Sequence, residues 1–260
     1  MNTPMPRFEF VRNFRDCGGF STQDGGTVRK RRLYRSAQFH EASETDLVTL
    51  ATLGITDIVD LRRPAERERY PCRRWPDFSA RVVEHTGIQG VDLPPHLAAF
   101  ADAGMSGAAA KRAMLEIYRG FPADPMISEL YRDFFQTLAD AKGAVLVHCA
   151  AGKDRTGLVV ALAQHIVGMK RDDILAHYLE TNRSDLVTEV VIAAMRDNSA
   201  REGRPFCDDA IMAVLTVTPE YLDTAFTAIE ARHGTIDAYL CDVIGVTPER
   251  RKRIIDRLIE

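Results

Sequence analysis

A cysteine and an arginine six positions apart, Cys149 and Arg155, lie in a short segment that also contains glycines. An apolar run from Val145 to Val147 enters this segment and a helical apolar run leaves it, which predicts a strand, a tight loop and a helix. Unpaired N–H groups and the helix dipole at such a loop favour a bound anion, and the same field favours a cysteine thiolate. A nucleophile, an anion-binding loop and an arginine together predict cleavage of a phosphate ester rather than a structural turn with an inert cysteine.

The other residues of this loop suit an in-line attack on phosphorus. The small side chains of Ala150, Ala151 and Gly152 let the backbone close around the anion, so that the N–H groups up to Arg155 can bind three phosphate oxygens. Arg155 can bind two equatorial oxygens and stabilise the charge of the transition state. Thr156 follows the arginine, and its hydroxyl can hydrogen-bond the cysteine sulfur and ease its departure in the second step.

Two carboxylates are candidates for the acid and the base of the reaction, Asp92 and Asp154. Asp92 lies on an irregular segment after a predicted strand, from which a general acid could swing toward the site. Asp154 lies inside the loop, where its charge is tolerable if the carboxyl is protonated, paired with Lys153 or aimed at a water. The sequence leaves open which carboxylate acts in which step.

Three further residues are candidates for supporting roles. His148 ends the strand, and we expect it to hydrogen-bond the backbone rather than to act as a base. Arg62 and Glu66 follow the predicted strand at 55–61, and ligands gather at the carboxyl ends of parallel strands. They are therefore candidates for the rim of the site, although an ion-paired turn explains them equally well. The sequence has no His-x-x-x-His pattern or carboxylate cluster, so we expect no metal and no other cofactor.

Short apolar runs alternate with helical patterns along the chain. Strands are predicted near Phe8, before a loop through 13–19, and at 33–36, 55–61, 80–85 and 144–147. Helices are predicted at 43–53, 108–118, 126–140, 156–167 and 171–180, and two Thr-Pro-Glu segments at 218–220 and 247–249 are typical of helix starts. The pattern predicts an α/β protein with a short, mostly parallel central sheet flanked by helices, and a largely helical C-terminal half.

No linker or repeat divides the chain, so we expect residues 1–260 to form a single phosphatase domain. Residues 186–195 and 207–217 are unusually apolar, and the stretch between them is polar. This pattern is typical of a helix pair with a flexible connection. Residues 182–217 are therefore predicted to contain a pair of helices.

The composition is that of an ordinary globular protein, with 45% apolar and 27% charged residues and a net charge of -3. This charge excludes a general basic field, so nucleic acid is not an expected partner and any attraction for phosphate must be local. The sequence has no long apolar window and no visible signal region, so we expect no integral membrane segment and a cytoplasmic location. The five scattered cysteines, without a Cys-x-x-Cys pair, argue against a disulfide framework or a zinc site.

The loop from His148 to Gly157 reads His-Cys-Ala-Ala-Gly-Lys-Asp-Arg-Thr-Gly and matches the pattern H-C-x-x-G-x-x-R-[ST]-G. The chain thereby resembles the cysteine-dependent protein tyrosine phosphatases, in the bacterial branch whose loop carries Lys-Asp. Shorter segments agree with that branch in the same order: Asn13 to Asp16, Leu33 to Ser36, Leu53 to Asp57, Asp60 to Arg62 with Glu66, Glu220 to Leu222, and Tyr239 with Leu240.

The resemblance implies a phosphocysteine intermediate on Cys149 and phosphate binding by Arg155. It implies phosphorylated substrates, which are proteins carrying phosphotyrosine, phosphoserine or phosphothreonine, or phosphoinositides. It also places Asp92 where the branch has an acid after its fourth strand, and Asp154 where the branch has a loop aspartate with a catalytic role. The branch also carries a mobile pair of helices over its active site, so the resemblance implies that the helix pair within residues 182–217, from Leu186 to Val217, forms such a helical lid. An ordinary core helix pair is the alternative.

Two other functions use the same loop. A phosphate-recognising pseudophosphatase would bind phosphate without turnover, but the chain retains Cys149, Arg155, Thr156 and two candidate acids. A sulfurtransferase or thiol redox protein would need neither Arg155 nor Thr156, and no second cysteine neighbours Cys149 in the sequence. Phosphomonoester hydrolysis is therefore the predicted function.

Overall fold

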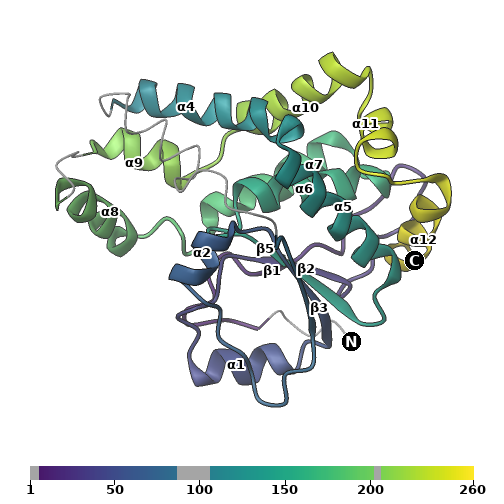
Figure 1. Ribbon diagram of the computed structural model, residues 1–260, viewed down its shortest axis with the longest axis horizontal. Coiled ribbons are helices and arrows are strands. Elements are labelled where there is room, and N and C mark those ends of the chain that lie inside the picture. The colour runs from purple at the N-terminus through teal and green to yellow at the C-terminus, as the bar shows by residue number, and fades with distance from the viewer. Residues whose placement is uncertain (1–5, 87–105, 202–205) are drawn as a thin grey trace.

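A five-stranded sheet lies at the centre of the protein (Figure 1). The computed structural model describes residues 6–86, 106–201 and 206–260. The strands are β1 (Arg15–Asp16), β2 (Leu33–Ser36), β3 (Ile55–Asp60), β4 (Arg81–Glu84) and β5 (Ala144–His148). Their order is β1-β2-β5-β3-β4, in which β1 pairs antiparallel with β2 and the other pairs are parallel. The short, mostly parallel sheet predicted from the sequence is confirmed.

Helices cover both faces of this sheet. They are α1 (Glu44–Ala51), α2 (Pro64–Arg69), α4 (Gly107–Gly120), α5 (Pro125–Asp140), α6 (Asp154–Ile166), α7 (Arg171–Leu179), α8 (Glu189–Arg201), α9 (Asp208–Leu215), α10 (Pro219–His233), α11 (Ile236–Asp242) and α12 (Pro248–Leu258), with 3-10 turns η1 (Phe121–Ala123) and η2 (Glu180–Arg183). α1 lies on one side of the sheet, and α5, α6 and α10 lie on the other (Figure 1). In the part of the chain that the structure describes, no helix is both long and apolar enough to cross a bilayer.

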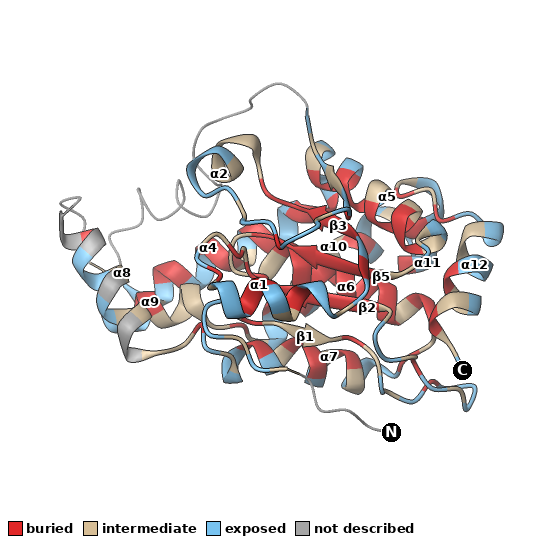
Figure 2. Ribbon diagram, turned by 90° about the horizontal axis from the view of Figure 1, so that it is seen from below, coloured by how far each residue is buried: buried red, intermediate tan, exposed pale blue. Residues whose placement is uncertain are grey.

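The central strand β5 is buried on both faces. Packing on both faces therefore fixes the position of its carboxyl end, from which the loop with Cys149 starts. Val145 and Val147 belong to the larger apolar core, with residues of α5 and α6, whereas Leu146 belongs to a second core with residues of α1. Successive side chains of a strand point to opposite faces, which explains the division. Figure 2 shows β5 and α6 buried at the centre of the molecule. Packing on both sides therefore holds His148, at the carboxyl end of β5, in place.

The helix starts follow their sequence signals with one exception. Ser43 Oγ accepts a hydrogen bond from Asp46 N at 3.1 Å, and the Asp46 carboxylate accepts one from Ser43 N at 3.3 Å, which is the predicted capping box of α1. Thr247 Oγ1 caps α12 by accepting from Arg250 N at 3.2 Å. Thr218 precedes α10 in the same Thr-Pro-Glu pattern, but its buried hydroxyl has no hydrogen-bond partner among the described residues.

The strand predicted near Phe8 is wrong. The N–H groups of Glu9 and Phe10 donate to the carboxylate of Asp46 at 2.8 and 2.9 Å, so this backbone pairs with the start of α1 and not with the sheet. The first strand, β1, lies instead within the segment predicted to be a loop.

Residues 182–217 hold the helices α8 and α9. α8 packs against α9, and α9 packs against α4. At the base of the segment, Asn182 Nδ2 donates to Val217 O and Val217 N donates to Asn182 Oδ1, both at 2.8 Å. The segment therefore leaves and rejoins the rest of the protein at one hydrogen-bonded point. The helix pair predicted from the sequence is present, and its mobility stays a prediction.

Candidate active site

The loop between β5 and α6 places Cys149 at the carboxyl end of the sheet. Cys149 is 2% exposed, and α6 begins at Asp154. Gly152 makes the tight turn possible, because its φ is +62° and a Cβ atom at this position would lie 2.0 Å from Ser36 O. The strand, tight loop and helix predicted around Cys149 are confirmed.

Side chains from the N-terminal part of the chain bind the carbonyl groups of this loop. Asn13 Nδ2 donates to the carbonyls of Ala151 and Gly152 at 3.0 Å each, and Arg35 Nη2 donates to Gly152 O at 2.7 Å. The backbone N–H groups of residues 150–153 have no acceptor among the residues that the structure describes. Because buried backbone groups need partners, these N–H groups are the natural donors for a bound anion.

Two arginines, Arg35 and the half-buried Arg15, lie beside the residues that bind the loop carbonyls. Arg35 is fully buried, and Arg15 Nη2 donates to His177 O at 3.2 Å and to Thr181 Oγ1 at 3.0 Å. Within the described ranges neither arginine pairs with a carboxylate. Burial lowers the pKa of both guanidinium groups, and the charge of Arg35 lowers the pKa of Arg15 further. Two positive charges with no paired carboxylate favour an anion in the loop above them.

Sequence reasoning assigned no catalytic or binding role to Asn13, Arg15 or Arg35. One signal for Arg35 was available, since an arginine within the predicted strand 33–36 must find partners when that strand is buried. Asn13 has a positive φ of 54°, which asparagine tolerates better than most residues. That conformation could not be read from the sequence alone.

Arg155 is held at the site by a carboxylate and two backbone contacts. Its Nη1 and Nη2 each donate to Glu66 at 2.7 Å, and Nη1 also donates to Leu61 O at 3.0 Å. Tyr131 OH donates to the carbonyl of Arg155 at 2.8 Å. Burial opposes the charge of Arg155, but Glu66 outweighs burial and raises the pKa of the guanidinium. Since a guanidinium has five N–H donors, Nε–H and one Nη2–H are left for two phosphate oxygens.

Glu66 thus lies at the site as predicted, but its partner is Arg155 and not Arg62. Arg62 is buried below the strand ends, where Nε and Nη2 donate to the two oxygens of Asp60 at 2.9 and 2.7 Å. Arg62 Nη1 donates to Gln38 Oε1 at 3.0 Å. The rim position is therefore wrong for Arg62, because the carboxylate of Asp60 binds its guanidinium below the surface. The alternative from the sequence, an ion-paired turn, is confirmed for Arg62, with Asp60 as its partner.

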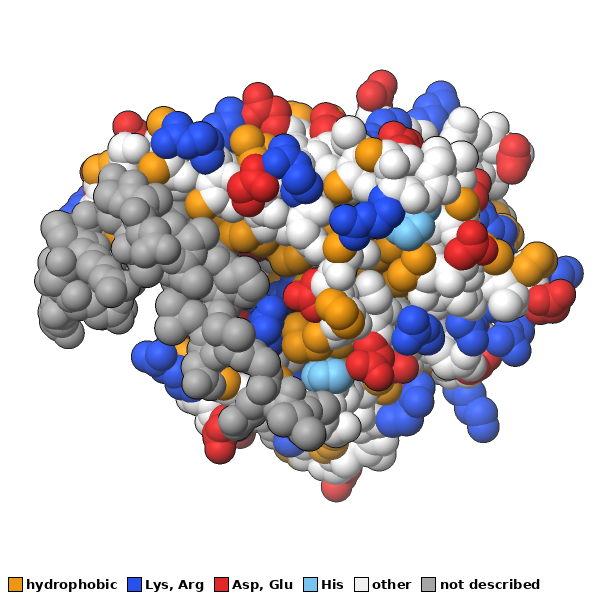
Figure 3. Space-filling view, turned by 45° about the horizontal axis from the view of Figure 1, so that its top comes forward, with side chains coloured by type: hydrophobic (Ala, Val, Ile, Leu, Met, Phe, Trp, Pro, Cys, Tyr) orange, Lys and Arg blue, Asp and Glu red, His pale blue; other side chains and the backbone are white. Residues whose placement is uncertain are grey.

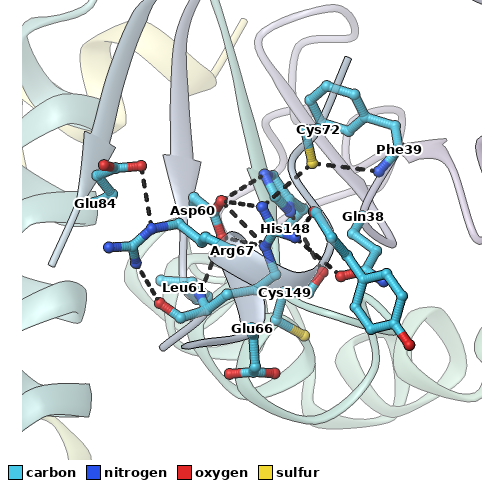
Figure 4. A network of polar contacts seen from close by, with 12 residues as sticks. Gln38, Phe39, Asp60, Leu61, Glu66, Arg67, Cys72, Glu84, His148 and Cys149 are labelled. Carbon is cyan, nitrogen blue, oxygen red and sulfur yellow. Dashed lines mark hydrogen bonds and ion pairs between the residues drawn. The ribbon is translucent and has the colours of Figure 1, made fainter. Parts of the chain in front are cut away.

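His148 belongs to the same buried network, and Figure 4 shows it beside Asp60 and next to Cys149. His148 Nε2 lies 3.6 Å from Asp60 Oδ2, and Nδ1 lies 3.3 Å from the carbonyl oxygen of Cys149. Burial lowers the pKa of His148, although Asp60 opposes the effect. The backbone contact expected for His148 is therefore present, with the carbonyl of Cys149 as its partner.

The two loop residues before Arg155 form a second polar cluster. Lys153 Nζ lies 2.8 Å from Asp154 Oδ1 and donates to Thr216 O at 3.2 Å. Tyr118 OH donates to the same Oδ1 at 2.7 Å, and Tyr178 OH lies 2.6 Å from Tyr118 OH. Lys153 is therefore the partner of Asp154, as one of the alternatives from the sequence had it. The tyrosines come from α4 and α7, and sequence reasoning did not single them out.

Two expectations remain. Thr156 Oγ1 is buried without a hydrogen-bond partner among the described residues, so the expected bond from Thr156 to the sulfur of Cys149 is absent from this conformation. Asp92 lies outside the described residues.

The described part of the face that Figure 3 shows carries charges of both signs. On the face in Figure 3, Lys and Arg side chains alternate with Asp and Glu, and no single sign dominates the described part of that face. Attraction for phosphate therefore resides in the loop and the two arginines beside it, as the small net charge predicted.

The comparisons with known proteins agree with this geometry. A model of the tyrosine phosphatase family matches residues 6–260. The chain belongs to the tyrosine phosphatase family. A tyrosine-protein phosphatase of Cupriavidus necator is 36% identical over 92% of this chain and 84% of its own length. The triple specificity protein phosphatase PtpB of Mycobacterium tuberculosis is 34% identical over 88% of this chain and 90% of its own length. A tyrosine-protein phosphatase of Nostoc commune is 28% identical over 58% of this chain and half of its own length.

Family membership confirms the enzyme class predicted from the loop. The protein is a phosphatase of the tyrosine phosphatase family, and the resemblance to its bacterial branch is borne out by PtpB. The pseudophosphatase and sulfur-transfer alternatives have no support in these relatives.

Proposed function

We propose that this phosphatase dephosphorylates proteins, with phosphotyrosine as its first substrate, through a phosphocysteine on Cys149. The observation that carries the proposal is the arrangement of Cys149 in a loop whose free N–H groups and Arg155 can bind one phosphate group. The relatives from Cupriavidus necator and Nostoc commune, which are named as tyrosine-protein phosphatases, support the same substrate.

In the first step, the Cys149 thiolate attacks phosphorus, and the electron pair of the breaking P–O bond goes to the leaving oxygen, which takes a proton from an acid. The loop N–H groups and Arg155 stabilise the transferring phosphoryl group. In the second step, water attacks phosphorus, the P–S bond breaks, and its electron pair returns to sulfur. We propose Asp92 and Asp154 as the acid and base of these two steps, with Thr156, His148 and Glu66 in supporting roles.

A phosphoinositide is the second candidate substrate, because the resemblance to the bacterial branch implies it and PtpB is named for more than one specificity. The positive charge that would favour an inositol phosphate is that of Lys153. Lys153 is 3% exposed and bound to Asp154 and Thr216, so this charge is committed to the protein in the conformation described here. The contacts of Lys153 with Asp154 and Thr216 therefore favour a phosphoprotein over a phosphoinositide as the substrate.

Release of phosphate from a panel of substrates tests the proposal. The panel holds a phosphotyrosine peptide, the matched phosphoserine and phosphothreonine peptides, and a phosphoinositide in micelles, with p-nitrophenyl phosphate as the common reference. We expect the highest kcat/KM on the phosphotyrosine peptide and no turnover by Cys149→Ser. Equal or faster turnover of the phosphoinositide would make the lipid the substrate, and turnover by Cys149→Ser would exclude the phosphocysteine.

We further propose that residues 182–217 act as a movable lid within one phosphatase domain, and that the protein acts in the cytoplasm. The described cysteines are all free, as a reducing compartment would keep them.

A further inference from the structure

The carboxylate of Asp154 is bound on one oxygen only. Oδ1 accepts from Tyr118 OH at 2.7 Å and lies 2.8 Å from Lys153 Nζ. Oδ2 receives no hydrogen bond from the described part of the protein, and the side chain is 20% exposed. The two donors therefore fix the carboxylate through Oδ1 and leave Oδ2 without a protein partner in the described residues.

Tyr118 is itself held on several sides. Its ring is fully buried and stacks on Tyr221 at 5.4 Å with 27° between the ring planes. Its hydroxyl lies 2.6 Å from Tyr178 OH. Tyr178 in turn packs against the start of α6, where a Cβ atom on Gly157 would lie 2.8 Å from its ring. The hydroxyl that reaches Asp154 thus belongs to a rigid aromatic cluster.

Hydrogen-bond chemistry sets the direction of this chain. An ionised carboxylate only accepts, so Tyr118 donates to Asp154, and Tyr178 must donate to Tyr118. Burial and the charge of Asp154 raise the pKa of both tyrosines well above the ordinary range, so both hydroxyls keep their protons. Oδ1 therefore accepts from Tyr118 and faces Lys153, and Oδ2 is the oxygen that is left to accept a proton.

We propose that Tyr118, supported by Tyr178, is a positioning residue that holds Asp154 as the base of the hydrolysis step. Oδ2 takes a proton from the attacking water, the new P–O bond forms as the P–S bond breaks, and the electron pair of that bond returns to Cys149 as the thiolate. Protonation of the leaving oxygen in the first step then falls to another group. This assignment rests on the proposed function and chooses between the two steps that the sequence left open.

Tyr118→Phe tests the proposal, because it keeps the buried ring and removes only the donor. General acid–base catalysis contributes about 10²- to 10⁴-fold, and loss of its positioning bond is expected to lower kcat about tenfold, with KM unchanged or lower. If hydrolysis of the phosphocysteine becomes the slow step in Tyr118→Phe, rapid mixing with p-nitrophenyl phosphate should show an initial burst of nitrophenol. The amount released in this burst should equal the enzyme concentration. Phenyl phosphate has a poorer leaving group than p-nitrophenyl phosphate. Tyr118→Phe should nevertheless lower kcat on phenyl phosphate by no larger factor than on p-nitrophenyl phosphate. Tyr178→Phe should show the same pattern with a smaller loss.

Tyr34→Phe is the matched control, since the Tyr34 hydroxyl is buried without a hydrogen-bond partner among the described residues. In the Asp154→Asn variant, adding Tyr118→Phe should not lower kcat further, because the effect of Tyr118 passes through Asp154. A kcat of Tyr118→Phe within twofold of wild type would overturn the proposal. A loss confined to phenyl phosphate without a burst would also overturn it, since the carboxyl would then act as the acid. If the wild-type protein itself released no phosphate, the proposed function would fail instead.

Discussion

Both oxygens of Glu66 bind Arg155, each accepting a hydrogen bond at 2.7 Å from a different terminal nitrogen. Glu66 lies on α2, after the end of β3, and Arg155 lies in the first turn of α6. The pair therefore joins two neighbouring strand ends across the site. It occupies one edge of the guanidinium and orients the other edge toward a phosphate group, so that little side-chain entropy is lost when substrate binds.

Glu66→Gln should lower kcat/KM on p-nitrophenyl phosphate by about 10- to 100-fold, because a charge-assisted hydrogen bond contributes about 1.5–3 kcal/mol and only one oxygen acceptor would remain. The fold should persist, since Glu66 lies in a half-buried helix. Glu68→Gln on the same helix removes an exposed carboxylate and serves as the control. Equal kinetics of the two variants would show that Arg155 needs no orienting partner.

Gly152→Ala should abolish activity and destabilise the protein by about 3 kcal/mol or more. A positive φ costs a residue with a Cβ atom about 1–2 kcal/mol, and the new atom would also clash with Ser36 O at 2.0 Å. Gly168→Ala is the matched control, because φ there is +75° but a Cβ atom at this position would meet no other atom within 4 Å. Urea unfolding of both variants separates the cost of the clash from the cost of the backbone strain. Equal unfolding midpoints would show that the close approach of residue 152 to Ser36 O contributes nothing to the difference.

The chemistry of the loop could be predicted because it is local. Cys149, Gly152 and Arg155 lie within seven residues of sequence, and their order between an apolar strand and an apolar helix already defines an anion-binding turn. The central strands were found for the same reason, since short β-branched runs that are buried on both faces leave a strong signal.

The supporting contacts could not be predicted because they join residues far apart in sequence. Glu66 was a candidate, but nothing in its neighbourhood distinguished Arg62 from Arg155 as its partner, and burial of Arg62 against Asp60 decided the matter. Tyr118 was only the last residue of the predicted helix at 108–118, and its role depends on where α4 meets the loop. β1 was missed because a two-residue strand carries no periodicity.

Acid should weaken the fold through Asp60. Burial opposes its ionisation, but His148 and Arg62 lower its pKa from 3.8 to about 2. Because the folded-state pKa lies below the unfolded-state value, ionised Asp60 stabilises the fold above about pH 4, by about 2 kcal/mol, and this contribution disappears as the pH falls from about 4 through about 2. Urea unfolding of wild type and Asp60→Asn at several pH values isolates the effect.

Asp60→Asn should be less stable than wild type at pH 7 by about 3–5 kcal/mol, since Arg62 keeps a buried charge without its carboxylate. The difference between the two proteins should shrink between about pH 4 and about pH 2. A constant difference across that range would mean that Asp60 is not ionised in the native protein.

Asn182→Ala should loosen residues 183–216 without unfolding the rest. The two hydrogen bonds from Asn182 to Val217 close the base of this segment, and each contributes about 1 kcal/mol. Their loss should raise the rate of limited proteolysis within the segment about 10- to 30-fold, because cleavage follows the population of the open form. Arg183→Ala removes only an exposed ion pair with Glu180 and should leave the rate nearly unchanged. Equal cleavage of the two variants would mean that packing of α9 on α4, and not the bond at the base, holds the segment closed.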